Sequence, residues 1–390
     1  MNKESVVVCG AGIVGLSCAL GLARGGFSVT LIGPRPTSPQ PEVGVYCPRV
    51  YAISSASQQF LADLGIWSLL DSARLTPVEC MEIYGDANGC VTLQAWQDAR
   101  TTLAWIMEAS ELERVLQQAV QVYGIHWQSE SFRERQATAV TTESGRRFAA
   151  NLLVGADGAS SPVRHAAGIA ARSRPYGDTG LVVHLTSDLP HQQTAMQWFT
   201  TDGVLALLPM PDTADGHQVS MVWSMPQSLA KTLQDLPEPQ RNADLQARLQ
   251  AVTGGRLGSL RVRSPLLGFP LFLEHSDMVA PGVALVGDAA HRIHPLAGQG
   301  LNLGLADVQE LLRVLGEKEA YRSVADYRVL QRYRRARAEP VLAMRLATDG
   351  LHRLFAAQSA PIAWARNAGM QCVDRLPFIK RFLIAGASGQ

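Results

Sequence analysis

Residues 287–307 combine an acidic side chain with a glycine-rich loop, and this combination can bind a polar, planar or anionic group. The stretch begins Gly287-Asp288-Ala289-Ala290-His291 and continues from His294-Pro295 through Gly298-Gln299-Gly300-Leu301-Asn302 to Asp307. Glycines let the backbone approach a ligand closely, and the N–H groups at a helix start attract negative charge. Asp288 adds an acceptor for hydroxyl groups. A flavin needs both features, because its ribityl chain carries hydroxyls and its pyrimidine edge accepts N–H groups.

A strand before this loop and a helix after it would hold the loop in place. Residues 283–286 form an apolar run that predicts a buried strand. From Leu301 onward, apolar residues recur at positions 301, 305, 308, 311 and 312, which predicts a helix. The predicted order is therefore strand, loop and helix. A connection without any ligand is the alternative interpretation.

A second glycine motif lies near the start of the chain. The sequence predicts a strand over 6–9, then Gly10-Ala11-Gly12-Ile13-Val14-Gly15 opening a helix to about Arg24, and a second strand over 28–32. This frame around G-x-G-x-x-G binds the pyrophosphate of a dinucleotide. Gly33 stands where an acidic residue normally ends the second strand and binds the adenosine ribose. We therefore expect backbone, water or another side chain to bind the ribose, with weaker retention of the cofactor.

The segment 294–307 resembles the signature of the ubiquinone-biosynthesis hydroxylases, a branch of the FAD-dependent aromatic monooxygenases similar to p-hydroxybenzoate hydroxylase-type enzymes. Residues 152–164 resemble the Asp-Gly motif of these monooxygenases, with Ser160 where the family often has Asn. Arg49, within 48–54, matches another family position. The resemblance covers nearly the whole chain.

The resemblance implies one FAD that is bound by both glycine motifs. The implied cofactor-binding residues are Gly10, Gly12, Gly15, Arg49, Asp157, Gly158, Arg164, Gly287, Asp288, Pro295, Gly298, Gly300, Leu301 and Asn302. The residues expected beside the reacting part of the flavin are Pro295, Gly298, Gln299 and Gly300. For Asp157 the alternative is a bond to the local backbone, and for Arg49 it is an exposed surface position.

The implied reaction is hydroxylation of a phenolic ring through a flavin C4a-hydroperoxide, with O₂ and NAD(P)H as co-substrates. The implied substrate is a lipophilic aromatic compound, a polyprenylated intermediate of ubiquinone biosynthesis. Two alternatives stay open: a flavin hydroxylase of another small aromatic compound, and a non-catalytic flavoprotein scaffold of a quinone-biosynthesis complex. The sequence indicates no specific base for the phenol.

The spacing of the motifs predicts a discontinuous cofactor domain, because the two glycine motifs lie about 270 residues apart. We predict an α/β fold in which a Rossmann-like FAD-binding domain is interrupted by a mostly antiparallel β-sheet substrate domain and followed by C-terminal helices. The predicted boundaries are 1–75, 98–175 and 276–345 for the FAD-binding domain, 76–97 and 176–275 for the substrate domain, and 346–390 for the helical segment.

The predicted substrate domain contains four short apolar runs, over 181–185, 195–199, 204–209 and 219–223, which predict antiparallel strands. A leucine-bearing polar stretch over 227–250 predicts a helix. These strands could form a pocket for an aromatic ring with a lipid tail, lined by Trp198, Phe199, Leu207, Met221 and Trp223. The alternative is that these side chains form ordinary sheet core.

The composition argues against several other classes of function. The net charge of +1 gives no bulk attraction to nucleic acid. The six cysteines show no C-x-x-C pair, Cys9 and Cys18 are expected to be buried thiols, and no metal site is predicted. A reducing cytoplasm is the expected compartment. Residues 5–23 are apolar, but their glycines favour a strand, turn and helix over a signal peptide or a membrane span.

Two C-terminal segments leave open a peripheral association with the inner face of the membrane or with a biosynthetic complex. Five arginines lie between 327 and 339, where a solvated helix face is expected and attraction to anionic lipid is the alternative. They are Arg328, Arg332, Arg334, Arg335 and Arg337. The tail 376–384 carries Lys380 and Arg381 opposite apolar residues, so it could bind a membrane or a partner, or pack on its own domain.

Overall fold

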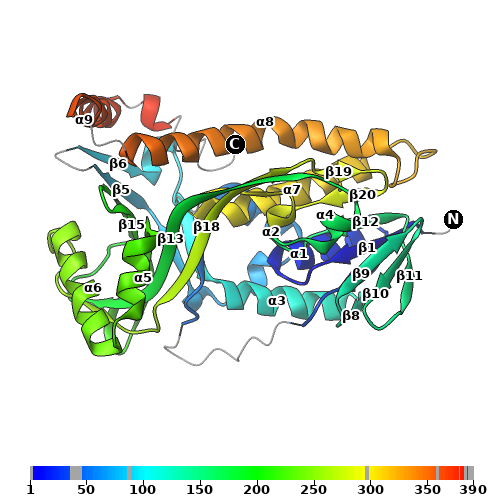
Figure 1. The fold of residues 1–390 in the computed structure, drawn as a ribbon, viewed down its shortest axis with the longest axis horizontal. Coiled ribbons are helices and arrows are strands. Elements are labelled where there is room, and N and C mark those ends of the chain that lie inside the picture. The colour runs from blue at the N-terminus through cyan, green and yellow to red at the C-terminus, as the bar shows by residue number, and fades with distance from the viewer. Residues whose placement is uncertain are drawn as a thin grey trace.

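A computed structural model describes residues 3–35, 46–85, 89–294, 298–356, 360–376, 378–381 and 384 (Figure 1). The α-helices are α1 Ile13–Arg24, α2 Ser55–Asp63, α3 Ala109–Val122, α4 Pro162–Ala166, α5 Gln227–Asp235, α6 Glu238–Thr253, α7 Gln299–Gly316, α8 Tyr327–Ala356 and α9 Ala360–Arg375. The strands before residue 160 are β1 Ser5–Cys9, β2 Ser28–Ile32, β3 Val50–Ser54, β4 Leu75–Val78, β5 Cys80–Tyr84, β6 Cys90–Gln94, β7 Ala104–Glu108, β8 His126–Gln128, β9 Phe132–Gln136, β10 Ala139–Thr142, β11 Arg147–Ala149 and β12 Leu152–Gly155. The later strands are β13 Ala171–Ser187, β14 Thr194–Thr200, β15 Gly203–Thr213, β16 Gly216–Pro226, β17 Leu260–Val262, β18 Leu267–Ser276, β19 Val279–Ala280, β20 Val283–Leu285 and β21 His291–Arg292.

A six-stranded sheet in the order β19-β20-β12-β1-β2-β8 forms the nucleotide-binding half. All its pairs are parallel except β19 with β20. The β-branched and leucine side chains of β1 and β12 are buried, as expected for strands that are covered on both faces. β1 lies beside β12 and β12 beside β20, so this sheet joins the start of the chain to the segment just before residue 287.

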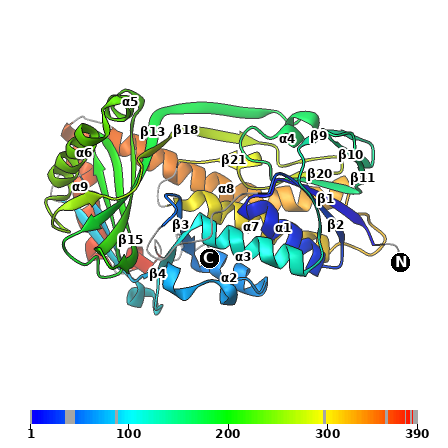
Figure 2. The same ribbon diagram turned by 90° about the horizontal axis from the view of Figure 1, so that it is seen from below.

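A larger sheet, which we call the large sheet, has its strands in the order β21-β18-β13-β16-β15-β14-β5-β6, and β17 pairs with β13 at its side. Its pairs are antiparallel apart from β14 with β5. Helices α5 and α6 cover one face (Figure 2). The small sheet β3-β7-β4 meets the other face, where Ala195 and Met210 pack against Val78 and Ile106.

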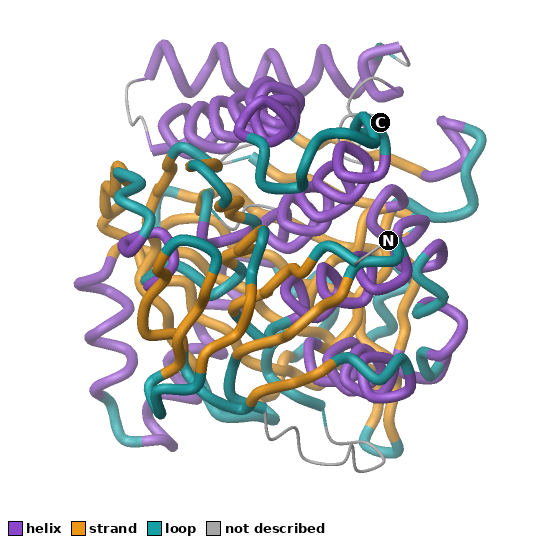
Figure 3. Tube along the Cα trace, turned by 90° about the vertical axis from the view of Figure 1, so that its right-hand side faces the viewer, coloured by secondary structure: helices purple, strands orange, loops and turns teal. Residues whose placement is uncertain are grey.

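Several helices lie on the outside of the strands (Figure 3). Helix α7 packs between α1 and α8, and α8 runs along one side of the molecule from the nucleotide-binding half to the large sheet (Figure 1). Helix α9 packs on β6 at the end of the large sheet. The strands β1 and β20 and the helices α1 and α7, which flank the glycine motifs, share one hydrophobic core.

The predicted fold class is confirmed by this arrangement. The predicted strands and helices around both glycine motifs are present within one or two residues, and β13 to β16 contain the four predicted apolar runs. The single helix predicted over 227–250 is wrong, because the chain forms α5 and α6 separated at Leu236-Pro237. Proline cannot donate the hydrogen bond that a continuous helix needs. The domain boundaries remain a prediction, and β13 crosses residue 176 as one strand.

The aromatic pocket lining predicted in the substrate domain is not found. Four of its residues form core between the large sheet and α5 and α6, and these are Trp198, Leu207, Met221 and Trp223. Phe199 stacks on Phe355 of α8, with ring centres 3.9 Å apart. The alternative interpretation, ordinary sheet core, therefore holds for these side chains.

The two C-terminal segments also depart from expectation. Arg337 is buried and only 6% exposed, so the solvated face predicted for the five arginines is wrong at this position. The tail packs on its own chain, since Lys380 is buried beside Asp374 at 2.6 Å and Ile384 is 2% exposed. Phe378 is 67% exposed. Among the described residues, no helix combines the length and the hydropathy needed to cross a bilayer.

Candidate active site

The first glycine motif has two glycines that packing requires and one that leaves open space. A Cβ atom added to Gly10 would lie 2.1 Å from the Ala156 carbonyl oxygen, and one added to Gly15 would lie 1.9 Å from the Gly10 carbonyl oxygen. A Cβ atom added to Gly12 would meet nothing within 4 Å. Gly10 and Gly15 therefore let β1, the turn and α1 pack closely, whereas Gly12 exposes backbone at the helix start.

The start of α1 fits a phosphate group. Gly12 is the N-cap residue, no side chain caps the helix, and its first turn holds no acidic residue. The first N–H groups of a helix have no partner within the helix, and the helix dipole favours an anion there. This backbone would hold the pyrophosphate of FAD.

The second glycine motif forms a similar backbone surface at the start of α7. Gly298 is the N-cap residue with φ of +66°, the first turn holds no acidic residue, and no side chain caps the helix. A Cβ atom added to Gly300 would meet nothing within 4 Å. Gln299 begins the helix, whereas Pro295 lies outside the described residues. These N–H groups would face a carbonyl oxygen of a flavin ring.

The structure brings the two glycine motifs together. A Cβ atom added to Gly287 would lie 3.3 Å from a methyl group of Val14, which is in the first motif. One added to Gly304, on α7, would lie 3.0 Å from the other methyl group of Val14. Asp288 follows at the turn and is exposed, so its carboxylate is available to the hydroxyl groups of a ribityl chain.

Asn302 holds the start of α7 on β3. Its Oδ1 accepts from the Ser54 N–H at 3.0 Å, and its Nδ2 donates to the Ala52 carbonyl at 2.8 Å. The side chain therefore bonds the protein, and only the Asn302 backbone remains for the cofactor role predicted from the sequence. Leu301 is 8% exposed and packs into the core.

A buried ionic cluster fixes the turn that carries Asp288. Asp307 on α7 is 0% exposed; it accepts from the Gly287 N–H at 3.0 Å and lies 2.6 Å from His291 Nε2. Arg337 Nε on α8 donates to its other oxygen at 2.7 Å. Burial raises the pKa of Asp307, but His291 and Arg337 outweigh this effect and hold it below its usual value. Sequence reasoning missed this cluster, although Asp307 ends the recognised signature.

Asp157 and Arg164 stabilise the neighbouring loop. Asp157 accepts from the Ser161 hydroxyl at 2.5 Å and from the Val163 N–H at 2.9 Å at the start of α4. Arg164 is 5% exposed and donates to the carbonyls of Ala289 at 2.8 Å and Ala159 at 2.6 Å. Burial raises the pKa of Asp157 despite these bonds.

Those contacts match the alternative reading of Asp157, and they tie the Asp-Gly turn to the turn that holds Asp288. Gly158 adopts φ of +79°, and a Cβ atom there would meet nothing within 4 Å. Gly158 thus leaves backbone open at this position.

Arg49 lies at the surface, where its guanidinium carbon is 5.1 Å from the centre of the Tyr51 ring. Burial raises the pKa of Tyr51 to about 12; Arg49 opposes this shift and Asp288 adds to it. The three side chains are therefore near enough to interact electrostatically. Arg49 would place a positive charge beside the turn that carries Asp288.

The adenosine end has no acidic side chain at Gly33, and the local packing leaves little room for one. A Cβ atom added to Gly33 would lie 2.9 Å from the Ala11 backbone nitrogen. Trp127 Nε1 donates to the Gly33 carbonyl at 2.9 Å, and Arg35 lies over the Trp127 ring at 4.9 Å. Arg35 and Trp127 lie at this end and could contact an adenosine group.

Two small apolar cavities lie between β3 and the large sheet. The first is lined by Pro48, Arg49 and Val50 together with Val182, Val222, Leu267 and Phe269. The second is lined by residues of six strands of the two sheets, among them Ala52, Ala104, Ala206 and Leu208. Because Ala52 is also held by Asn302, the cavities adjoin the strand on which α7 is fixed.

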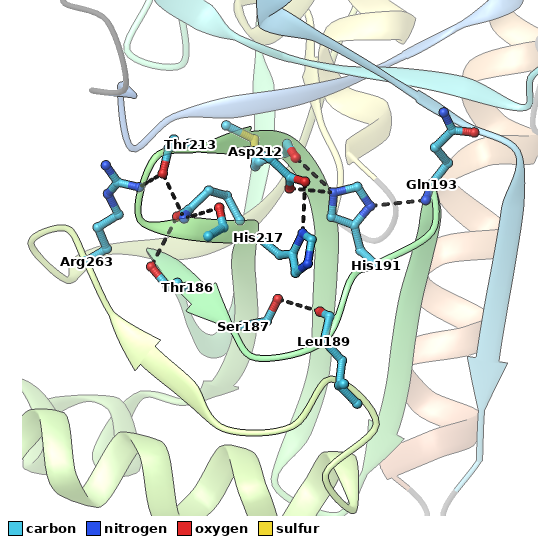
Figure 4. A network of polar contacts seen from close by, with 12 residues as sticks. Thr186, Ser187, Leu189, His191, Gln193, Asp212, Thr213, His217 and Arg263 are labelled. Carbon is cyan, nitrogen blue, oxygen red and sulfur yellow. Dashed lines mark hydrogen bonds and ion pairs between the residues drawn. The ribbon is translucent and has the colours of Figure 1, made fainter.

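A polar network holds the end of the large sheet beyond these cavities (Figure 4). His191 Nε2 donates to the Met210 carbonyl at 2.9 Å, and Asp212 lies 2.9 Å from His217 Nδ1. Arg263 donates to the Thr213 hydroxyl at 2.6 Å. Burial lowers the pKa of His191. Within the described residues, no group of three His, Cys, Asp or Glu side chains could hold a metal ion.

Comparisons with known proteins agree with this geometry. A family model described as "FAD binding domain" matches residues 3–345. The chain is 32% identical to 3-demethoxyubiquinol 3-hydroxylase of Escherichia coli (strain K12), over 100% of this chain and 99% of that protein. It is 28% identical to the human ubiquinone biosynthesis monooxygenase COQ6, over 98% of this chain and 92% of that protein.

Solved structures with the same fold include PqsL of P. aeruginosa in complex with 2-aminobenzoylacetate. That structure has a TM-score of 0.77 and 21% identity, and covers 95% of this chain and 100% of its own. The p-nitrophenol 4-monooxygenase PnpA of Pseudomonas putida DLL-E4 has a TM-score of 0.77 and 16% identity, over 99% of this chain and 98% of its own. At these identities the likeness is one of fold.

Proposed function

The chain belongs to the FAD-binding domain family and is an FAD-dependent monooxygenase, and from this membership we propose that it hydroxylates a prenylated phenol in ubiquinone biosynthesis. The membership confirms the resemblance stated from the sequence. FAD is the cofactor and NAD(P)H the reductant that is typical of the family. The name of the Escherichia coli relative and the apolar cavities beside β3 support a lipophilic aromatic substrate.

The observation that carries the proposal is that the two glycine motifs meet at Val14, while Gly298 at the start of α7 adjoins Ala52, which lines an apolar cavity beside the large sheet. We propose that the start of α1 binds the pyrophosphate and that Asp288 binds the ribityl hydroxyls. The start of α7, from Gly298 to Asn302, would hold the flavin ring through its N–H groups. Bound FAD supplies the activation of O₂ and the transfer of one oxygen atom to the ring. The apolar walls of the two cavities beside β3 would exclude water from the reacting groups.

The assay that tests the proposal uses the purified FAD-loaded protein, NAD(P)H and a set of phenols with prenyl chains of increasing length. We expect substrate-dependent NAD(P)H oxidation and a product that carries one oxygen atom from isotopically labelled O₂. Unprenylated phenols alone as substrates would favour the hydroxylase of another small aromatic compound. A protein that binds FAD but oxidises none of the phenols would favour the scaffold.

The proposed role of Asp288 can be tested separately. Asp288→Ala removes an exposed carboxylate, so we expect the dissociation constant of FAD to rise about 10–100-fold, as for the loss of a charge-assisted hydrogen bond, at unchanged fold. Asp202→Ala is the matched control, because Asp202 is also exposed but lies in the turn between β14 and β15. Equal FAD affinity in both variants would remove the ribityl assignment.

We also propose that the protein works at an anionic membrane surface, which it contacts through α8. The exposed residues of α8 between 342 and 354 are mainly apolar, with Leu342 at 45%, Leu346 at 60%, Leu351 at 41% and Leu354 at 41% exposure. An exposed patch of this kind marks an interaction site. Three arginines on the same helix would attract anionic lipid; they are Arg335, Arg345 and Arg353.

Sedimentation with vesicles tests the membrane proposal. Binding to vesicles with phosphatidylglycerol, but not to neutral vesicles, is expected, and Leu342→Gln with Leu346→Gln should abolish it. Leu69→Gln, at another exposed leucine, is the control. Dimerisation through α8 without lipid binding would contradict the proposal.

A further inference from the structure

Two buried polar side chains lie side by side on the face of the large sheet that meets β3. His184 on β13 is 4% exposed and Ser220 on β16 is 0% exposed. The two residues are register partners in the antiparallel β13–β16 pair. Directly opposed residues point to the same face and lie within contact range. His184 and Ser220 therefore form one polar group on this face.

The hydrogen bonding of His184 defines which of its nitrogens is free. His184 Nε2 lies 2.8 Å from the Cys47 carbonyl oxygen. A carbonyl oxygen only accepts, so Nε2 carries the hydrogen and Nδ1 is left as an acceptor. Within the described residues, His184 Nδ1 and Ser220 Oγ are buried without a hydrogen-bond partner. Because buried polar atoms are nearly always hydrogen-bonded, this pair is arranged for a partner from outside the chain.

On one side the pair adjoins apolar residues that line the two cavities. Ser220 is also the register partner of Leu208 on β15, which lines one cavity. Val222 lies two residues further along the same face, and with Val182 it lines the other cavity. The pair therefore borders residues that line each of the two cavities. An apolar wall with a few convergent polar groups is typical of a site for a small apolar ligand that carries a hydroxyl group.

We propose that His184 Nδ1 accepts the hydrogen bond of the substrate's phenolic hydroxyl and takes its proton, while the Ser220 hydroxyl bonds the same oxygen. This inference rests on the proposed hydroxylation of a phenol. The phenol O–H bond breaks and an Nδ1–H bond forms, and both electrons of the broken bond stay on oxygen. The oxygen then donates electron density to the ring carbon that is hydroxylated. The imidazolium returns its proton to solvent after the product leaves.

The electrostatic surroundings keep His184 able to accept a proton at neutral pH. Burial lowers the pKa of His184, the Cys47 carbonyl opposes this, and Arg263 lowers it further. The Arg263 N–H donates to the His184 carbonyl at 2.9 Å, while its side chain is held by Thr213 (Figure 4). The Tyr46 ring lies edge-on to the His184 ring, with ring centres 6.4 Å apart. The charges of Arg74, Glu108 and Asp212 in turn affect the pKa of Tyr46. The imidazole is therefore neutral at pH 7 and can accept.

His184→Gln separates the proposed role from a structural one. The glutamine amide can keep the donor to the Cys47 carbonyl, but it has no basic nitrogen in place of Nδ1. Ser220→Ala is the second variant. Ser224→Ala is the matched control, because Ser224 lies four residues along the same strand and its hydroxyl already donates to the Val204 carbonyl. Circular dichroism and FAD content establish that each variant is folded and loaded.

The first measurement is binding, and it does not depend on turnover. A phenol with one isoprene unit and its methyl ether are titrated into each FAD-loaded protein and followed by flavin absorbance. The wild type should prefer the phenol by about ten-fold, as expected for a buried hydrogen bond, and His184→Gln should lose this preference. The Ser224→Ala control should keep it. Equal preference in the wild type and in His184→Gln would overturn the inference.

The second measurement is the pH dependence of kcat with the same phenol. We expect kcat of His184→Gln to fall about 100-fold or more, as for loss of a general base, with a smaller change in KM. The wild type should lose activity as the pH falls below 6.5, because a base must be neutral, and the variant should lack this acid limb. Wild-type kcat and an unchanged acid limb in His184→Gln would show a merely structural histidine. No turnover of any phenol by the wild type would instead refute the proposed function, and the binding result would still decide the inference.

Discussion

The carboxylate of Asp307 is a buried charge on which the geometry of the turn that carries Asp288 depends, and Asp307→Asn tests this. The substitution keeps the size of the side chain but removes its charge. It leaves the Arg337 guanidinium, which is 6% exposed, without an anionic partner. It also weakens the contacts to His291 and to the Gly287 N–H.

The expected magnitude follows from the burial of the cluster. Removing one partner of a buried ion pair costs about 3–5 kcal/mol, because the other charge stays desolvated. Asparagine can still accept one hydrogen bond, so we expect a loss near the lower end, about 3 kcal/mol of the free energy of unfolding. That is a large share of the stability of a typical domain, about 5–15 kcal/mol. FAD affinity should fall as well, because Gly287 precedes Asp288.

Urea unfolding at a fixed excess of FAD, followed by circular dichroism, measures the loss. Arg313→Gln is the control, because Arg313 is exposed and pairs with Glu310 and Glu317 at the surface. Exposed pairs contribute little, so the control should change stability by less than about 1 kcal/mol. Joint replacement by Asp307→Leu and Arg337→Met should recover part of the stability, because the buried Arg337 charge is removed together with its anionic partner. If Asp307→Asn is as stable as the control, the reasoning on the buried cluster is refuted.

Three further predictions follow from the same site. Gly12→Ala should raise the dissociation constant of FAD at least about ten-fold without loss of stability, because its methyl group meets open space in the protein but lies where the pyrophosphate would bind. Gly10→Ala should instead destabilise the fold by more than about 2 kcal/mol, measured by urea unfolding. The reverse pattern would contradict both assignments. Gly33→Glu, which restores the usual acid, should destabilise the protein by about 1–3 kcal/mol and should not improve FAD retention on dilution, because the added Cβ would press on Ala11; tighter retention at full stability would refute this. The pKa of Asp307 is lowered in the folded state, so the ionised carboxylate stabilises the fold above its unfolded pKa of about 3.9, and this stabilisation is lost as the pH falls through the folded value. The free energy of unfolding in urea, measured against pH, should drop below about pH 4 in the wild type and drop less in Asp307→Asn. Parallel curves for the two proteins would count against the assignment.

Local patterns in the sequence predicted the parts of the fold that depend on neighbouring residues. The strand, loop and helix from 283 to 316 and the frame from 6 to 32 follow from hydrophobic periodicity and glycine spacing, and both are present. The close packing at Gly10 and the open space at Gly12 also agree with the spacing of the motif, because a tight turn and an open helix start are local features.

Residues that act through distant partners could not be predicted in this way. Periodicity shows that Trp198 and Leu207 share a face of their strands, but not whether α5 or β3 covers that face. Arg337 looks like any other arginine on a basic helix until α7 brings Asp307 beside it. Asn302 was expected to bind the cofactor, and its partner Ser54 is 248 residues away. The pairing of His184 with Ser220 depends on strand register, which the sequence does not state.

The joining of the two glycine motifs also determines when the protein can acquire its cofactor during synthesis. β1 and α1 are complete about 250 residues before Gly287 leaves the ribosome, which is roughly 13–50 s at 5–20 residues per second. Once β12 has been made, it lacks its parallel neighbour β20 until residues 283–285 follow, so an apolar strand edge is open to wrong partners. A nascent chain that ends before residue 287 holds the pyrophosphate turn without the turn that carries Asp288. On the binding site proposed above, which needs both turns, FAD can stabilise the chain only after Asp288 has been made, so its supply acts late in folding.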